Sequence, residues 1–105
     1  MDVAGVTRAV HPWGLVAEFI EARGRSQRDF AEIIGKSPVE VNYIIKGKKD
    51  INADFAIRFG LAFGTTAEVW YNLQKKYDLF KASQSEKKNE YTWIEDRARP
   101  LSLSL

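Results

Sequence analysis

Residues 26–49 read SQRDFAEIIGKSPVEVNYIIKGKK, and this stretch decides the fold of the chain. Apolar residues recur at helical spacing on both sides of Gly35, and glycine favours the left-handed backbone that ends a helix. Ser26 and Ser37 each precede a helical run and have an acidic residue three positions later, which is the pattern of a capping box or a close variant. Pro38 fits a first helical position, where its missing N–H costs nothing. The stretch therefore predicts two short helices joined by a tight turn, at residues 27–34 and 38–46.

The same signals predict three further helices around this pair, at residues 13–23, 53–63 and 67 to about 81. Gly24, Gly47 and Gly64 follow helical runs and should terminate them. Asn52 is an expected N-cap, and residues 65–68 (TTAE) resemble another capping box. The helix at 53–63 is apolar almost all round, so we expect it to lie centrally and to contact several others. The predicted fold class is all-α, a five-helix domain with a short C-terminal extension.

The chain divides into an N-terminal arm at residues 1–10, a helical domain at 11–81 and a C-terminal extension at 82–105. The extension is mostly polar and charged, and it is interrupted by Tyr91, Trp93 and Ile94. These bulky side chains need a surface to pack on, so we predict that they bind a partner, which is a second subunit or a toxin, or that they contact the preceding helix. A solvated, partly flexible tail is the alternative. Leucine and serine alternate over residues 101–105, which fits a short strand and equally a frayed end.

Composition excludes several classes of function. The chain of 105 residues has no cysteine, one histidine (His11) and a net charge of +2. Without thiols or a histidine cluster we expect no disulfide, no metal site, no cofactor and no enzymatic activity. Neither a membrane-spanning run nor a signal peptide is recognisable, so a cytoplasmic protein without membrane contact is expected. Because the net charge is small, any argument for nucleic-acid binding must rest on where the charged residues lie.

Two short helices joined by a glycine-containing turn form the helix-turn-helix arrangement, whose second helix enters the major groove of DNA. Gln27 opens the first helix, where a phosphate is favoured. Asn42 and Tyr43 lie on the expected exposed face of the second helix, where Asn42 suits a base edge. Lysines at both ends of this helix suit phosphates. The predicted DNA-binding residues are Gln27, Lys36, Ser37, Val39, Glu40, Asn42, Tyr43, Lys46, Lys48 and Lys49.

The first turn of the second helix is poor in hydrogen-bond donors. Pro38 and Val39 offer none from their side chains, although Val39 suits contact with a thymine methyl group. Glu40 suits a cytosine, but its place in the capping box favours a structural role. A second interpretation is therefore that the protein recognises the shape of the DNA rather than its bases.

Several blocks of sequence resemble a known family. Residues 26–37 with 47–49 resemble the Xre/Cro-type helix-turn-helix. The flanking blocks are similar to HigA-type antitoxins, and they read HPWG (11–14), INADFAIRFG (51–60), FGTTAEVWYNLQ (63–74) and YDL (77–79). The resemblance implies a bacterial type II antitoxin that binds its double-stranded operator DNA as a homodimer, represses its own operon and neutralises a cognate toxin, usually a RelE-like mRNA interferase. It also implies that Gln27 bonds a DNA phosphate.

Two interpretations of the apolar residues in the fifth predicted helix remain open. Trp70 and Tyr77 share its apolar stripe, and they are predicted as partner-binding residues in a dimer seam or, more simply, as core. Two alternatives to the antitoxin also remain. One is a free-standing Xre-type repressor without a toxin. The other is a protein-interaction module with degenerate DNA binding, which Pro38, Val39 and the low net charge favour.

Overall fold

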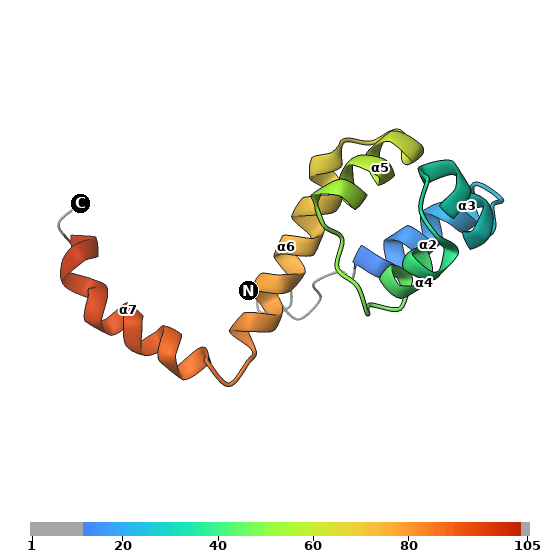
Figure 1. Cartoon of the computed structure of the whole chain (residues 1–105). Coiled ribbons are helices and arrows are strands. Elements are labelled where there is room, and N and C mark those ends of the chain that lie inside the picture. The colour runs from blue at the N-terminus through green and yellow to red at the C-terminus, as the bar shows by residue number, and fades with distance from the viewer. Residues whose placement is uncertain (1–11, 104–105) are drawn as a thin grey trace.

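The computed structural model describes residues 12–103, which form six α-helices and no strand (Figure 1). The helices are α2 (Pro12–Ala22), α3 (Gln27–Ile34), α4 (Pro38–Ile45), α5 (Ala53–Phe63), α6 (Ala67–Ser83) and α7 (Lys88–Leu103). The predicted all-α class is confirmed, and the first five helices follow the predicted positions to within about two residues. Helix α7 was not predicted. The proposed arm at residues 1–10 and His11 lie outside the described residues.

Most of the predicted helix signals are confirmed at the atomic level. The expected terminators Gly24, Gly35, Gly47 and Gly64 have φ between 68° and 76°, the left-handed region. The hydroxyl of Ser37 accepts from the N–H of Glu40 at 3.1 Å, and the Glu40 carboxylate accepts from the Ser37 N–H at 3.4 Å, which completes a capping box. The Ser26 hydroxyl accepts from the Asp29 N–H, and the Asn52 side chain accepts from the Phe55 N–H.

The predicted box at residues 65–68 is wrong in its register. Thr66, not Thr65, is the N-cap of α6, and its side chain makes no capping hydrogen bond. The hydroxyl of Thr65 instead accepts the indole N–H of Trp70 at 2.9 Å. The threonine is therefore used to satisfy the polar atom of a buried aromatic side chain.

The core is centred on α5, as its composition predicted. Phe55, Phe59 and Phe63 are buried along one side of this helix, and the fully buried Trp70 of α6 packs against the rings of Phe59 and Phe63. The expectation that α5 lies centrally and contacts several helices is confirmed, although its residues Ile57 and Leu61 are 53% and 81% exposed. Burial follows the face that meets α2, α3 and α6, and the opposite face is left outside.

Helices α5 and α6 meet at unusually close range. A Cβ added to Gly60 would lie 2.9 Å from the backbone nitrogen of Ala67, so only glycine allows this approach. Farther along α6, the buried Gln74 accepts the N–H of Ile51 at 2.9 Å and donates to Asp78. This buried side chain fixes the segment that leads from α4 into α5.

Helix α7 corrects one expectation for the C-terminal extension. Figure 1 shows it reaching away from the other helices at the end of α6. Residues 101–103 belong to this helix, so the predicted strand is wrong where the structure describes it. A strand needs a neighbour for its backbone groups, and a helix satisfies them internally. Local pairs add support: the Arg97 guanidinium lies 4.6 Å from the centre of the Trp93 ring, and Arg99 pairs with Asp96.

Candidate nucleic-acid interface

Helices α3 and α4 form a helix-turn-helix whose inner faces are closed by the core. Phe30, Ala31 and Ile34 of α3 are buried, as are Val41 and Ile44 of α4. Gly35 turns the chain with φ 73°, and its N–H and that of Lys36 return to carbonyls of α3. With its inner face fixed, α4 presents a single outer face to solvent. The exposed predicted residues on it are Val39, Tyr43 and Lys46, with Asn42 at its margin.

A side-chain hydrogen bond joins the two helices at this outer face. The Asn42 amide N–H donates to the Gln27 side-chain oxygen at 3.2 Å. Both residues were predicted for DNA binding, and the structure brings them together across 15 positions of sequence. The hydrogen bond uses the Gln27 side-chain oxygen as its acceptor, so the amide N–H groups of Gln27 remain as donors near the N-terminus of α3. Such an arrangement suits a phosphate oxygen.

A second cluster holds the turn of the motif against α5. Asp54 forms an ion pair with Lys36 at 3.1 Å and with Arg58 at 3.0 Å. Arg58 also donates to the Ile34 carbonyl at 2.7 Å, one of the last carbonyls of α3. Lys36 first, and Arg58 second, lower the pKa of the Asp54 carboxyl below its usual value. In the structure the Lys36 ammonium is paired with Asp54, and the predicted contact of Lys36 with phosphate stays a prediction.

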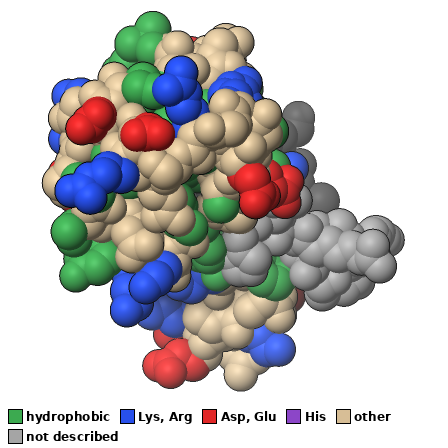
Figure 2. Space-filling model, turned by 90° about the vertical axis from the view of Figure 1, so that its right-hand side faces the viewer, with side chains coloured by type: hydrophobic (Ala, Val, Ile, Leu, Met, Phe, Trp, Pro, Cys, Tyr) green, Lys and Arg blue, Asp and Glu red, His purple; other side chains and the backbone are tan. Residues whose placement is uncertain are grey.

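The remaining predicted lysines divide into two groups. Lys46 and Lys48 are exposed just after α4. Lys49 is partly buried, with its ammonium 5.8 Å from the centre of the Phe55 ring. Figure 2 shows the side of the molecule on which α3 lies, where Lys and Arg side chains are scattered among other side chains, with Asp and Glu near some of them. Positive charge is thus local rather than spread over a broad surface, in keeping with the net charge of +2.

Comparisons with known proteins agree with this geometry. A helix-turn-helix family model matches residues 16–70. The chain is 32% identical to the antitoxin HigA-1 of Vibrio cholerae, over 87% of this chain and 81% of the relative. The chain belongs to the HigA-type helix-turn-helix family.

Two solved structures extend this HigA-type assignment to the fold. The addiction module antidote protein of the HigA family from Coxiella burnetii has a TM-score of 0.70 at 33% identity, covering 85% of this chain and 94% of that one. The Pseudomonas aeruginosa antitoxin HigA, solved with the higBA promoter, has a TM-score of 0.73 at 35% identity, covering 78% and 90%. The predicted family resemblance is confirmed.

Two of the predicted partner-binding residues of this HigA-type chain, Trp70 and Tyr77, pack against other residues of the domain. Trp70 is fully buried, so its side chain is unavailable to a second molecule, and the simpler core reading is the one that holds. The half-buried Tyr77 packs edge-on against Trp13, with ring centres 4.6 Å apart. Tyr91, Trp93 and Ile94 of α7 are 44%, 59% and 58% exposed. Contact with a partner therefore remains a prediction for these three.

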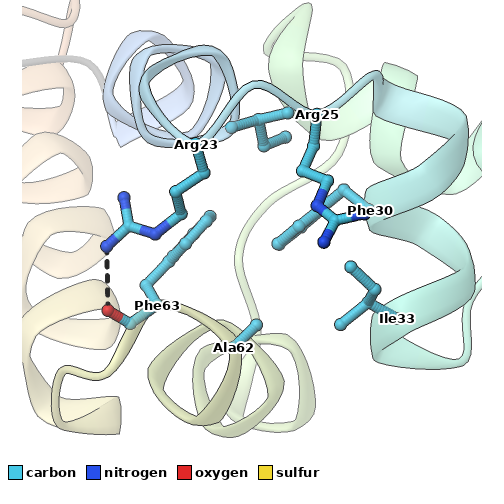
Figure 3. A pocket seen from close by; sticks show the side chains of 7 residues that line it. Arg23, Arg25, Phe30, Ile33, Ala62 and Phe63 are labelled. Atoms are coloured by element: carbon cyan, nitrogen blue, oxygen red, sulfur yellow. Dashed lines mark hydrogen bonds between the residues drawn. The ribbon is translucent and has the colours of Figure 1, made fainter.

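A small hollow lies between the end of α2, α3 and α5 (Figure 3). Its volume is about 270 Å³, and Phe30, Phe63 and two arginines are among its lining residues. Arg23 donates to the Phe63 carbonyl at 3.0 Å and to the Phe19 carbonyl at 3.2 Å. Its guanidinium is thereby committed to joining α2 and α5, so we interpret the hollow as a packing feature rather than a ligand site.

Other kinds of site find no support in the described part of the chain. Residues 12–103 contain no group of three or more acidic or histidine side chains placed to hold a metal ion. None of the described helices is long and apolar enough to cross a membrane.

Replacing Asp54 with asparagine should lower stability at neutral pH, and this deficit should disappear in acid. The folded-state pKa of Asp54 is lowered, so its ion pairs stabilise the fold above the unfolded pKa of about 3.9. That contribution is lost as the pH falls through the folded pKa. Urea unfolding of both proteins at a series of pH values measures the difference.

Glu68→Gln is the matched control for Asp54→Asn. It also removes a carboxylate from the second position of a helix, α6, and the ion pairs found in residues 12–103 do not include Glu68. The loss with falling pH should be larger for Asp54→Asn than for this control. An Asp54→Asn deficit that persists unchanged at the lowest pH would contradict the ion-pair account.

Proposed function

We propose that this protein is an antitoxin that binds operator DNA as a dimer, represses its own operon and neutralises a cognate RelE-like toxin. The observation that carries the DNA-binding part is the hydrogen-bonded pair of Gln27 and Asn42, which joins the start of α3 to the outer face of α4. The relative from Pseudomonas aeruginosa, solved with promoter DNA, supports it. In this proposal each α4 enters a major groove, and two half-sites lie about one helical turn, ~34 Å, apart.

The division of labour among the side chains is part of the proposal. Gln27, Lys46 and Lys48 contact phosphates and set the register, while Asn42, Tyr43 and Val39 meet the bases. Glu40 and Ser37 form the capping box, so their side chains position α4 rather than contact DNA. Because the first turn of α4 offers few donors, base contacts are few, and DNA shape contributes to selectivity.

Replacing Lys46 and Lys48 together with alanine should weaken binding to the gene's own upstream DNA and flatten its salt dependence. Each lost phosphate contact lowers the slope of log K against log salt by about 1. Titrations between about 50 and 200 mM salt measure both quantities. Removing exposed Lys75 and Lys76 of α6 makes the same change in charge, and it should alter neither.

Asn42→Ala distinguishes base contacts from phosphate contacts in the same assay. We expect it to relax preference among operator variants while leaving the salt slope nearly unchanged. If the double lysine variant keeps the wild-type slope, these lysines do not contact phosphates. If the wild type binds its upstream DNA no better than unrelated DNA, the interaction-module alternative is favoured.

The toxin separates the antitoxin from a free-standing repressor. Relatives named antitoxins support the first reading. A small basic protein encoded beside this gene should co-purify with the chain and lose its toxicity when the two are expressed together. A neighbouring product that is non-toxic and does not bind would favour the free-standing repressor.

A further inference from the structure

The carboxylate of Asp54 lies among basic side chains at the start of α5. The Lys36 ammonium is 3.1 Å from one of its oxygens, and Arg58 Nε donates to both oxygens, at 3.0 and 3.1 Å. The ammonium groups of Lys36 and Lys49 lie 5.1 and 5.8 Å from the centre of the Phe55 ring. Three basic side chains, from the turn before α4, from the segment after it and from α5 itself, thus lie around the first turn of α5.

This cluster is open to solvent, and its members differ in how firmly they are held. The side chains of Asp54, Lys36 and Arg58 are 50%, 24% and 37% exposed. Arg58 is fixed by a second bond, because it also donates to the Ile34 carbonyl at 2.7 Å. An ion pair between partly exposed groups is weak, since water competes for both of them. Lys36 can therefore leave Asp54 for another anion at little cost, while Arg58 stays in place.

The cluster also lies beside the end of α4 that faces DNA in the proposed function. Lys36 directly precedes Ser37, which is the N-cap of α4. The N-terminal residues of a recognition helix contact base edges in the major groove, so the groups beside that end lie near the phosphates that border the groove. A lysine reaches such a phosphate on a flexible four-carbon stem.

The chemistry of the cluster suits a phosphate group. Carboxylate and phosphate oxygens accept the same charge-assisted hydrogen bonds from arginine and lysine. In the structure the oxygens of Asp54 take the positions at Lys36 and Arg58 that oxygens of a phosphate can take. Lys49 adds a further positive charge, and the ion pairs found within residues 12–103 do not include it.

The geometry points to a phosphate-binding site for the DNA backbone formed by Lys36, Arg58 and Lys49, in which Asp54 is an internal anion that competes with the phosphate. This inference rests on the proposed function and adds two residues of α5, Arg58 and Asp54, to the surface that meets DNA. Asp54 thereby limits the affinity of the motif for the DNA backbone, although its own contacts hold the turn against α5.

The sign of one substitution separates this role from a purely structural one. If Asp54 only holds the turn, Asp54→Asn loosens the motif and DNA binding becomes weaker or stays the same. If Asp54 competes with phosphate, the same substitution frees Lys36, and DNA binding becomes tighter. A short duplex of unrelated sequence is the suitable probe, because non-specific binding comes almost entirely from phosphate contacts.

Binding of the full chain to this duplex, titrated at neutral pH, tests the inference. For Asp54→Asn we expect the dissociation constant to fall about three- to fivefold at ~100 mM salt, the effect of one added phosphate contact. The slope of log K against log salt should become steeper by about 1. Far-UV circular dichroism at the assay temperature verifies that each variant is folded.

Lys36→Ala shows whether the freed lysine is the cause. Alone it should change the dissociation constant by less than about twofold, because Asp54 already restrains this lysine. The double variant Asp54→Asn with Lys36→Ala should lose the gain in affinity and the steeper slope, so the two substitutions are not additive. A gain that persists without Lys36 would overturn the inference, as would unchanged or weaker binding by Asp54→Asn.

Glu68→Gln is the matched control for charge. It removes one carboxylate from the start of α6, which follows the opposite end of α5, and should change the dissociation constant by less than about twofold. An equal gain from Glu68→Gln would assign the effect to net charge and contradict the site. Preference of the wild type for its own upstream DNA over the unrelated duplex tests the proposed function separately, because it does not depend on the outcome at Asp54.

Discussion

Replacing Trp70 with alanine is expected to lower the free energy of unfolding by about 3–5 kcal/mol. The side chain is fully buried, and its ring lies 5.2 Å from that of Phe19 and 5.2 Å from that of Phe63, centre to centre. Its removal opens a cavity where α2, α5 and α6 meet, and it leaves the Thr65 hydroxyl without the indole N–H. For a domain of this size the midpoint of thermal unfolding should fall by at least about 12 °C.

Trp93→Ala provides the control for this experiment, since it removes the same side chain from a 59% exposed position on α7. Its effect on unfolding should stay within about 0.5 kcal/mol when the protein is monomeric. Circular dichroism at 222 nm should follow both transitions, because tryptophan fluorescence changes with each substitution. Equal losses for the two variants would show that Trp70 does not occupy the core of the folded protein.

Local rules were sufficient to predict most of the domain. Helix α3 begins after Ser26 and ends before Gly35 because each residue satisfies backbone groups at its own end of the helix. These interactions span only a few residues, so they can be predicted without knowledge of the tertiary fold. The capping box expected at residues 65–68 does not form, because a contact made by the tertiary fold replaces the local one. The buried Trp70 donates its indole N–H to the Thr65 hydroxyl, so this hydroxyl serves the core rather than the start of α6.

The candidate site was predictable in its position and less so in its detail. Outward-facing residues of α4 follow from helical periodicity once Val41 and Ile44 are recognised as buried. The ion pair between Lys36 and Asp54 could not be predicted, because it depends on how closely the turn approaches α5. The same holds for the bond between Gln27 and Asn42. Side-chain partners that are distant in sequence become known only when the helices have been placed.

The inner face of the motif is fixed by packing, and its outer face carries few polar side chains. This arrangement is compatible with DNA binding by a chain of small net charge. Arg58 and Asp54 hold the turn from the side of α5, and the Gln27–Asn42 bond holds the outer side. In the proposed complex, DNA would meet side chains that are already oriented, so less conformational entropy would be lost on binding. In the proposed dimer, affinity would come from two modest contacts rather than from one strongly basic surface.

Gly60→Ala is expected to destabilise the fold by about 1–3 kcal/mol or more. The new methyl group would lie 2.9 Å from the Ala67 nitrogen and 3.1 Å from the Thr65 carbonyl oxygen, which are backbone atoms that cannot rotate away. Relief requires α6 to move off α5, and the packing of Trp70 depends on that contact. Gly14→Ala in α2 is the opposite case, because nothing lies within 4 Å of its added Cβ.

Comparison of the two glycine variants separates helix propensity from packing. Both substitutions place alanine in a helix, which by itself favours the folded state by about 0.5–1 kcal/mol. Gly14→Ala should therefore be slightly more stable than wild type, whereas Gly60→Ala should be much less stable in the same urea titration. If both variants gained stability, α5 and α6 would not approach each other as closely as the structure shows. The sign of the Gly60 effect thus tests the contact on which the buried position of Trp70 depends.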